Sequence, residues 1–456
     1  MLSPKHALNH EENQLIPQTS KPEPDQRPIL KTNKSELSEL AIKKKQANVV
    51  VQPRLKPSVF AYDSIITEPV ITSQHSVKDE AFFQFDDLPL NRRGYKYRVC
   101  KPNRALKATR YLTTELPPYK VRASYFDKSQ GVGLTADMTS ITTQNGWLSA
   151  RCNVSMREGK YYFEYNIVNS NNGDDKAHVR VGIGRKELAL DAPVGFDGYG
   201  YGLRDLNGQK ITLSRPQEFM SEGFHTGDTI GFLVELPPLT RQRDGNSEFA
   251  KKFREKYPKS KKPTRAALNE EKEEKALNAF SNILRDQVAI KYKNGLFYEQ
   301  FEYTRTKQMD HLLNPVTVFG ETAVLEKKPD AQPPVPTIPD SRIVVYKNGQ
   351  CVGEMFNELY SFLPLDTADD AASTEANTKQ QQNPSYRNTD DGSLGYYPMM
   401  SVFQNGVVKI NGGPDFKYAV PEGAQPLCKR YDEAVVEDWL WDLVDEVEAE
   451  YLDSFD

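Results

Sequence analysis

The sequence is poor in cysteine, and its cysteines are widely spaced. Only four occur among 456 residues, at Cys100, Cys152, Cys351 and Cys428. No CxxC pair is present, so neither a zinc ribbon nor a dithiol redox motif is indicated. Such sparse cysteine usage is typical of proteins that stay in a reducing compartment.

Long apolar runs are also absent. No segment approaches the roughly 20 apolar residues that a membrane-spanning helix needs. The N-terminal stretch MLSPKHALNHEENQ lacks the apolar core of a signal peptide. We therefore expect no membrane association and a cytosolic or nuclear location.

The signatures of common enzyme classes are missing. HExxH, GxSxG, P-loop and zinc-deaminase motifs do not occur. Gly198, Gly200 and Gly202 form a GxGxG, but no helical pattern follows, which argues against a nucleotide site. His178 and His225 are isolated, and the abundant acidic residues do not resolve into an acid–base pair. We predict a protein that is not an enzyme and that uses no metal or cofactor.

The residues that are present divide the chain unevenly. Hydrophobic residues make up 38% and charged residues 27%, and the mean hydropathy is -0.66. Part of the chain is therefore too polar to fold, and residues 1–90 are predicted to be a disordered or docking arm. The arm contains the basic run Lys43–Lys45, which fits either a nuclear import signal or a solvated charge cluster. Its short apolar pieces, among them Val59–Tyr62 and Ala81–Phe85, could dock as strands.

A series of short β-branched and aromatic runs begins near Tyr95. Asn-Gly pairs at 145–146, 348–349 and 405–406 lie between or beside them, and Asn-Gly is the strongest local signal of a hairpin. We predict an all-β antiparallel sandwich over residues 91–430, with long loop insertions near 239–286, 327–340 and 364–394. The predicted strands are Tyr161–Val168, His178–Ile183, Thr229–Glu235, Arg342–Tyr346, Val352–Phe356, Met399–Gln404 and Val407–Asn411.

Residues 431–456 carry a different pattern, which predicts an amphipathic helix over 434–451. Apolar residues recur there at helical spacing, and acidic residues fill the other face. A helix of this length is stabilised mainly by packing of its apolar face. It could pack on its own domain, or it could enter a groove on a partner with a hydrophobic and partly basic surface. Its terminal position and its acidity favour the partner.

The central motifs, taken in order, resemble those of the SPRY domain. That family has a GxYYFE-like strand, a VRVGIG-like strand, a GYG segment and a late hairpin with Asn-Gly. The resemblance covers roughly residues 95–420. The matching segments are 146–147, 157–164, 179–184, 195–197, 199–202, 227–231 and 345–349.

A narrower resemblance is to the family called absent, small or homeotic discs two. This family supplies the SPRY subunit of COMPASS-type histone H3 lysine methyltransferase complexes. The match is carried by Arg180, the segment 191–197, the segment 201–204, the insertion after Pro237 and the acidic tail 435–448. No cysteine precedes Cys100, which agrees with the fungal Bre-two version, since that version lacks a zinc-containing N-terminal region.

The resemblance implies a scaffold that regulates transcription by stimulating a SET-domain methyltransferase in the nucleus. Its SPRY cleft would bind an acidic segment of the WD40-propeller subunit through Arg180, Pro193, Phe196 and Arg204. Arginine suits this task because its planar fork matches carboxylates. Phe196 would replace the family's more common Tyr, and Leu206 stands where some relatives have Lys. From the residues alone, Arg180 could instead pair with an Asp or Glu of its own domain.

The resemblance also assigns the terminal helix to a dumpy-thirty-type dimeric subunit, whose helices would accept its apolar face. The anchors would be Trp439, Leu440, Leu443, Val444, Val447 and Tyr451. The basic run 251–265 could add a salt-sensitive contact to nucleosomal DNA, or it could be a solvated loop. Its candidate residues are Lys251, Lys252, Arg254, Lys259, Lys261 and Lys262.

Two other interpretations are open. A SPRY domain could serve as the peptide-binding adaptor of a ubiquitin ligase, although no RING or box-like segment accompanies it. A β-sandwich could also be a carbohydrate-active enzyme, which would require two carboxylates facing each other in a cleft.

Overall fold

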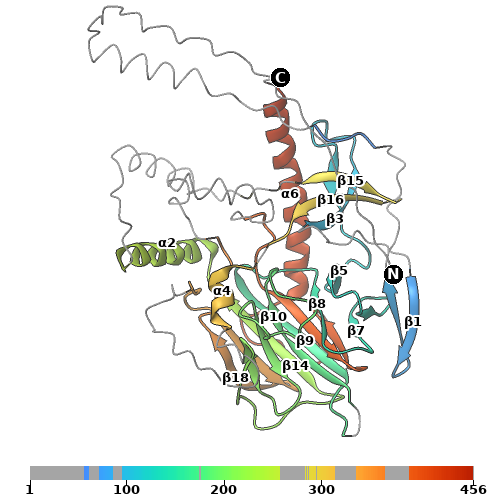
Figure 1. Ribbon diagram of the computed structural model, residues 1–456, viewed down its shortest axis with the longest axis vertical. Coiled ribbons are helices and arrows are strands. Elements are labelled where there is room, and N and C mark those ends of the chain that lie inside the picture. The colour runs from blue at the N-terminus through green and yellow to red at the C-terminus, as the bar shows by residue number, and fades with distance from the viewer. Residues whose placement is uncertain are drawn as a thin grey trace, which may run out of the picture. The chain divides into compact units, whose positions relative to one another are not determined.

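Two β-sheets packed face to face form the body of the computed structural model (Figure 1). All the residues that the structure describes lie within one unit, Arg54–Asp456. The described residues are 56–60, 71–85, 95–173, 176–256, 283, 285, 287–293, 295–303, 305–313, 335–364 and 390–454.

Among these residues, the first sheet runs in the order β1-β2-β6-β7-β20-β9-β14-β17-β18, with β21 paired in parallel to β9. Every other pairing in this sheet is antiparallel. The strands are β1 Ile71–Val77, β2 Glu80–Phe85, β6 Gly133–Leu134, β7 Ser140–Thr142, β9 Gly159–Asn169, β14 Thr229–Leu236, β17 Arg342–Lys347, β18 Gln350–Asn357, β20 Val407–Asn411 and β21 Gln425–Pro426.

The second sheet of the sandwich has the order β13-β12-β11-β10-β19-β8-β5, and a separate sheet has the order β15-β16-β3-β4. Both are antiparallel in the described residues. The strands are β3 Tyr95–Pro102, β4 Tyr111–Thr113, β5 Ala123–Lys128, β8 Leu148–Cys152, β10 His178–Gly184, β11 Gly200–Arg204, β12 Lys210–Thr212, β13 Arg215–Gln217, β15 Val288–Tyr292, β16 Gly295–Phe301 and β19 Tyr397–Phe403.

The core lies between the two large sheets, where inward-facing side chains of both interdigitate. On β9, Phe163 stacks on Phe232 of β14 with ring centroids 5.9 Å apart. Tyr165 reaches across the core, where its hydroxyl donates to Gly182 O at 2.6 Å and accepts from Met399 N at 3.0 Å. These bonds satisfy the buried phenol and hold the two sheets in register.

The predicted all-β fold is confirmed, and each of the seven predicted strands overlaps an observed one. The Asn348-Gly349 pair is a two-residue hairpin turn, because Lys347 pairs with Gln350. Both residues have positive φ, 51° and 80°, as a type I′ turn requires. The hairpin interpretation is wrong for Asn145-Gly146, between β7 and β8, and for Asn405-Gly406, between β19 and β20, because in each case the two strands belong to different sheets. Gly406 is needed there because a Cβ would come 2.2 Å from His178 O.

Three helices are described: α2 Leu239–Lys256, α4 Lys307–Leu312 and α6 Leu427–Asp453. The segment that begins at 239 is therefore a helix at first, and not a loop; of the rest of that insertion, only residues 283 and 285 are described. The predicted terminal helix is confirmed as α6. It begins seven residues earlier than Ala434 because Leu427 and Tyr431 are buried in the sandwich core.

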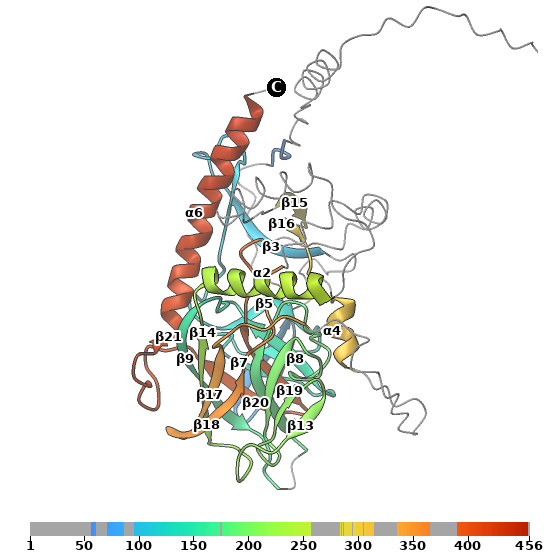
Figure 2. The same cartoon turned by 90° about the vertical axis from the view of Figure 1, so that its left-hand side faces the viewer.

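Beyond Tyr431, α6 leaves the sandwich and runs past the four-stranded sheet (Figure 2). Ala81–Phe85, which we expected to dock as a strand, lies in β2, which pairs with β1 and, through Phe83 and Leu134, with β6. Among the described residues, we find no helix whose length and apolar content would suit a membrane span.

Candidate partner-binding surfaces

Arg180 and Arg204, the charged residues of the predicted cleft, lie on the outer face of the second sheet, where β10 and β11 pair. Arg180 is directly opposite Arg204 in the register. Like charges in this position repel each other. No carboxylate among the described residues lies within ion-pair distance of either arginine, so the internal partner considered for Arg180 is not found. The arrangement leaves two adjacent cations for an external anion.

Arg180 is held rigidly although it lacks a carboxylate. Its guanidinium lies 5.0 Å from the centroid of the Trp147 ring, and its Nη1 donates to Val194 O at 3.2 Å. Only 8% of the residue is exposed, and its Nε atom has no hydrogen-bond partner. Burial first, and then the charge of Arg204, lower the pKa of Arg180 to about 10. A carboxylate bound here would favour the charged form of Arg180 and so raise its pKa again.

The segment between β10 and β11 supplies the apolar part of the cleft. Pro193 is half-buried on this segment, and Phe196 is 44% exposed. Leu206, which follows β11, is also 44% exposed, and Arg204 donates to Gln209 Oε1 at 2.8 Å. Arg180 and Arg204 are thus neighbours across the β10–β11 pair, and the bond to Val194 O brings the segment between the two strands beside Arg180, while the role of the predicted residues stays a prediction.

Trp147 is a member of this surface to which the sequence assigned no role. Its ring lies under Arg180 and 5.4 Å from the ring of Phe403. The sequence signal that could have pointed to Trp147 was its place in the Gly146-Trp147 motif, just before a strand. His178, by contrast, binds Asp205 at 2.8 Å, and the same carboxylate accepts from Ser170 and Val179 N. This is the structural role expected for an isolated histidine.

Helix α6 carries the second candidate surface. Seven apolar side chains, which we call the apolar stripe, are between 37% and 67% exposed. They lie along one face of the helix, at intervals of three and four residues. The apolar stripe consists of Val436, Trp439, Leu440, Leu443, Val444, Val447 and Tyr451.

The acidic face of α6 is turned toward the protein. Arg285 donates to Asp442 Oδ1 at 2.5 Å and to Asp445 Oδ2 at 2.6 Å. Arg98 pairs with Asp438, and Asp442 also accepts from Thr113 N at 2.7 Å. The acidity had suggested a hydrophobic and partly basic surface on a partner. Asp438, Asp442 and Asp445 instead bind basic groups of the same chain, while Glu448 and Glu450 are exposed, so a basic surface on a partner stays a prediction.

Glu446 anchors the outer half of the helix. Its carboxylate accepts hydrogen bonds from Ala108 N at 2.8 Å, from Thr109 N at 2.7 Å and from the amide of Lys107. The Thr109 hydroxyl also donates to it, at 2.6 Å. Burial alone would raise the pKa of Glu446, but these hydrogen bonds outweigh it and hold the pKa below its ordinary value. Successive amides of this kind form an anion-binding nest.

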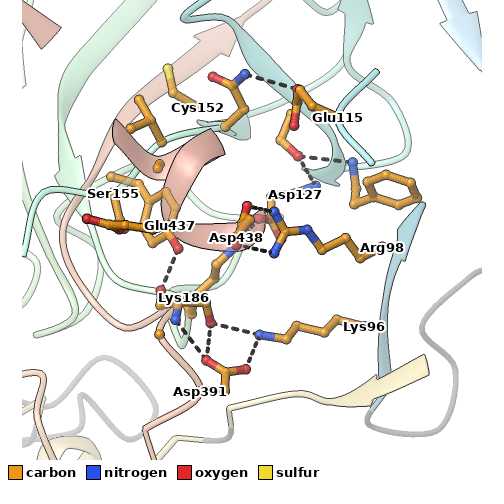
Figure 3. Close-up of a pocket in the computed structure, with 18 of the residues that line it drawn as sticks. Lys96, Arg98, Glu115, Asp127, Cys152, Ser155, Lys186, Asp391, Glu437 and Asp438 are labelled. Atoms are coloured by element: carbon orange, nitrogen blue, oxygen red, sulfur yellow. Dashed lines mark hydrogen bonds and ion pairs between the residues drawn. The ribbon is translucent and has the colours of Figure 1, made fainter. Parts of the chain in front are cut away.

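A polar cavity of about 430 Å³ lies between β3, the sandwich and the inner half of α6 (Figure 3). Ion pairs cross it: Lys96 binds Asp391 at 2.9 Å, Lys186 binds Asp127, and Arg98 binds Asp438. Burial would raise the pKa values of Asp127 and Asp391, yet their lysine partners hold both below the ordinary range. These ion pairs link β3, the sandwich and α6 across the cavity, and they help to fix the direction of α6.

The candidate DNA contacts are only partly described. Lys251 and Lys252 are exposed on the last turns of α2, where Lys252 pairs with Glu248 at 2.7 Å. Arg254 lies in α2, but its side chain is outside the described residues, as are Lys259, Lys261 and Lys262 altogether. Among the described residues, no group of three or more His, Cys, Asp or Glu side chains is arranged to hold a metal.

The architecture defines a class: an antiparallel β-sandwich with a projecting helix at its C-terminal end. The chain is 33% identical over 93% of its length to the Set1 complex component ash2 of Schizosaccharomyces pombe, of which it covers 56%. It is 32% identical to the COMPASS component cclA of Colletotrichum higginsianum, covering 80% of this chain and 68% of that one. The chain belongs to this family of Set1 and COMPASS complex components.

Two further comparisons give lower sequence identities. The COMPASS component BRE2 of Saccharomyces cerevisiae is 27% identical over 83% of this chain and 93% of that one. The chain thus spans between 56% and 93% of the length of these three relatives. A human SPRY domain is 12% identical, covers 63% of this chain and 98% of that one, and gives a TM-score of 0.28. At this TM-score, the structural likeness adds no support to the resemblance that the sequence motifs carry. No protein-family model matches the chain.

Proposed function

We propose that the chain is a non-catalytic scaffold subunit of a COMPASS-type complex that methylates histone H3 at lysine four. The SET-domain methyltransferase is a separate chain in this proposal. The scaffold stimulates it by shifting a mobile catalytic domain toward its active arrangement, and so takes part in transcription regulation in the nucleus. Membership of the family of Set1 and COMPASS components supports this assignment.

The orientation of α6 is the observation that carries the proposal. Its charged face is bound to the same chain, and its apolar stripe faces solvent. An exposed apolar face of this extent marks an interaction site. A dumpy-thirty-type dimer, through a groove between its helices, is the proposed occupant of Trp439, Leu440, Leu443, Val444, Val447 and Tyr451.

The cleft on β10 and β11 is proposed to bind an acidic segment of the WD40-propeller subunit. Arg180 and Arg204 supply two cations that form no ion pair among the described residues, and Pro193 and Phe196 supply an apolar rim. A carboxylate between the arginines would remove their mutual repulsion and gain charge-assisted hydrogen bonds, each contributing about 1.5–3 kcal/mol. The basic end of α2 and the residues after it are proposed to touch nucleosomal DNA through phosphate contacts.

Purification of the tagged chain from nuclear extract tests the proposal. Because Asp442 and Glu446 anchor β4 and the loop before it, truncation of α6 would disturb the fold. A Leu440→Asp, Val447→Asp variant leaves these anchors in place. We expect the wild type to recover a SET-domain methyltransferase, a propeller subunit and the small dimeric subunit.

The variant should lose only the small dimeric subunit. Methyltransferase rates that do not change when the chain is left out of the reconstituted complex would refute the stimulation. Recovery of ubiquitin-ligase components in place of a methyltransferase would favour the adaptor interpretation.

A further inference from the structure

The outer face of the second sheet is covered over part of its area by the segment between β10 and β11. Ala192 O of this segment accepts from the Ser149 hydroxyl of β8 at 2.7 Å. Val194 N donates to the Ser401 hydroxyl of β19 at 2.9 Å. Arg180 is paired with Ser401 in the register, so these bonds fall in the row of residues that includes the cleft arginine. Among the described residues, no hydrogen bond from the segment reaches the next outward-facing row.

Three rings make up this next row, which we call the aromatic row: Trp147, Phe403 and His178. The centroid of the Phe403 ring lies 5.4 Å from that of Trp147 and 6.3 Å from that of His178. All three residues are half-buried. Val179 and Val402, their neighbours along the chain, belong to the core, so the rings of the aromatic row point outward.

The aromatic row lies directly beside the cleft. Arg180 follows His178 by two residues on β10, and residues two apart on a strand lie on one face, about 6.6 Å apart. The Arg180 guanidinium lies 5.0 Å from the centroid of the Trp147 ring, and its buried Nε atom has no hydrogen-bond partner. A nine-tenths buried cation with an unused donor thus adjoins half-buried rings. This combination suits a ligand that carries both a carboxylate and an apolar side chain.

We propose that the aromatic row is an apolar subsite of the arginine cleft, filled by an aromatic or long aliphatic side chain of the bound acidic segment. The inference rests on the proposed function, because it concerns the same segment of the propeller subunit. An extended peptide repeats its side chains on one face about every 6.6 Å, which is the spacing between Arg180 and His178 along β10. The subsite therefore selects segments in which one residue separates an acidic residue from an apolar one.

An apolar side chain suits the aromatic row better than a second carboxylate does. His178 Nδ1 is bonded to Asp205 Oδ2 at 2.8 Å, and Asp205 is buried, so a further carboxylate would lie near an existing negative charge. It would also meet the electron-rich faces of the rings. An apolar side chain gains free energy from burial there. Charge would then attract acidic segments in general, and the aromatic row would discriminate among them.

The experiment measures the affinity of the full-length chain for labelled peptides of equal net charge by fluorescence anisotropy. One peptide contains Glu-Glu-Gly-Phe between glycines, another contains the reversed order Phe-Gly-Glu-Glu, and each has a counterpart with Ser in place of Phe. At physiological ionic strength we expect one of the Phe peptides to bind about five- to tenfold more tightly than its Ser counterpart. This ratio should persist at high salt, while the affinity of every peptide falls.

Phe403→Ala separates a subsite from mere support of Arg180, which is held by Trp147 and Val194 O. The variant should lose the preference for Phe and bind the Ser peptides as the wild type does. Phe416→Ala is the matched control, because Phe416 is a half-buried phenylalanine on the outer face of the first sheet. It should keep the preference, and thermal unfolding reports whether both variants are folded.

Equal affinities of the wild type for the Phe and Ser peptides in both orders would overturn the inference while leaving the acidic cleft intact. A Phe403→Ala variant that weakened both kinds of peptide equally would also overturn it, since the row would then only support Arg180. Retention of the preference by Phe403→Ala would have the same meaning. Failure of the wild type to bind any of the acidic peptides would instead overturn the proposed cleft, and the inference with it.

Discussion

The apolar stripe of α6 and the arginine cleft of β10 and β11 are built in opposite ways. On α6, the charges face inward, where Arg98, Arg285 and backbone amides bind them, and the apolar side chains face solvent. In the cleft, two arginines face each other and apolar side chains support them. The stripe leaves apolar side chains unburied, whereas the cleft leaves two positive charges without an ion-pair partner among the described residues.

This difference predicts how each surface responds to salt. Burial of apolar area is not screened by ions, and an anchor residue that becomes buried contributes roughly 1.5–3 kcal/mol. Attraction between charges weakens as the Debye length shortens, from about 8 Å at physiological ionic strength to about 3 Å at 1 M salt. Binding at the stripe should therefore persist in high salt, while binding at the cleft should fade.

The largest expected effect comes from placing a charge in the centre of the stripe. Leu443 is 37% exposed, so its replacement by Asp needs little rearrangement of the free protein. In the complex, the variant must bury a carboxylate in an apolar groove, which adds a desolvation cost to the lost contact. We expect Leu443→Asp to weaken binding of the dimeric subunit at least about 100-fold, measured by titration calorimetry.

Val420→Asp is the matched control, since Val420 is also a partly exposed apolar residue but lies outside α6. It should bind as the wild type does, and thermal unfolding of both variants should match the wild type. If Leu443→Asp retained full affinity, the stripe would not be the docking face. The proposed contrast between an apolar and a charged binding surface would then be wrong.

A smaller effect, with a different salt dependence, is expected in the cleft. Arg204→Ala removes one of the two cations and relieves the repulsion in the free protein, so only part of the interaction energy is lost. We expect an acidic peptide to bind about 10- to 30-fold more weakly at 0.15 M salt, from the loss of one charge-assisted contact. The slope of affinity against salt should fall as well, as measured by fluorescence anisotropy.

Arg215→Ala is the control, because Arg215 is an exposed arginine on β13 of the same sheet. Arg180→Lys adds a second readout: it keeps the charge but loses the planar fork and the contact with the Trp147 ring. Affinity restored fully by the lysine would mean that the cleft attracts only by charge. Identical salt slopes for wild type and Arg204→Ala would contradict the electrostatic role.

The sequence predicted those features that depend on neighbours along the chain. The strands followed from alternating β-branched runs, and the stripe followed from helical spacing between Leu440 and Tyr451. The partners of the acidic face did not follow, because Arg98 and the amides of 107–109 lie more than 300 residues before the helix. Spacing shows that a face is acidic but does not show what it contacts.

The same limit explains the mistaken turn. Asn348-Gly349 and Asn405-Gly406 look alike in sequence, and both have the conformational freedom of a tight turn. Only the first joins neighbouring strands, while the second crosses between sheets and requires Gly because of the approach of His178 O. Trp147 was missed for a related reason, since its contact with Arg180 exists only after the sheet has formed.

The smallest expected effect concerns the inward face, on which the outward orientation of the stripe depends. The pKa of Glu446 is lowered from its ordinary value of 4.5, because the bonds from Thr109 and from the amides of 107–109 outweigh burial. At any pH above the unfolded-state pKa of Glu446, its ionised form therefore makes its full contribution to stability. This contribution is lost as the pH falls through the lower folded-state pKa. Glu446→Gln should lower the free energy of unfolding by about 1–2 kcal/mol at pH 7.

Below about pH 4 the wild type should lose this advantage, so that the difference between the two proteins shrinks, as measured by urea unfolding at a series of pH values. Glu450→Gln is the control, because Glu450 is an exposed glutamate on the same helix, and it should change stability little at any pH. Equal stabilities of the wild type and Glu446→Gln from pH 7 down to pH 3 would show that the nest binds the glutamine amide as well as the carboxylate. The inward face of α6 would then be held by shape and not by charge, and only the cleft would remain an electrostatic surface in the comparison.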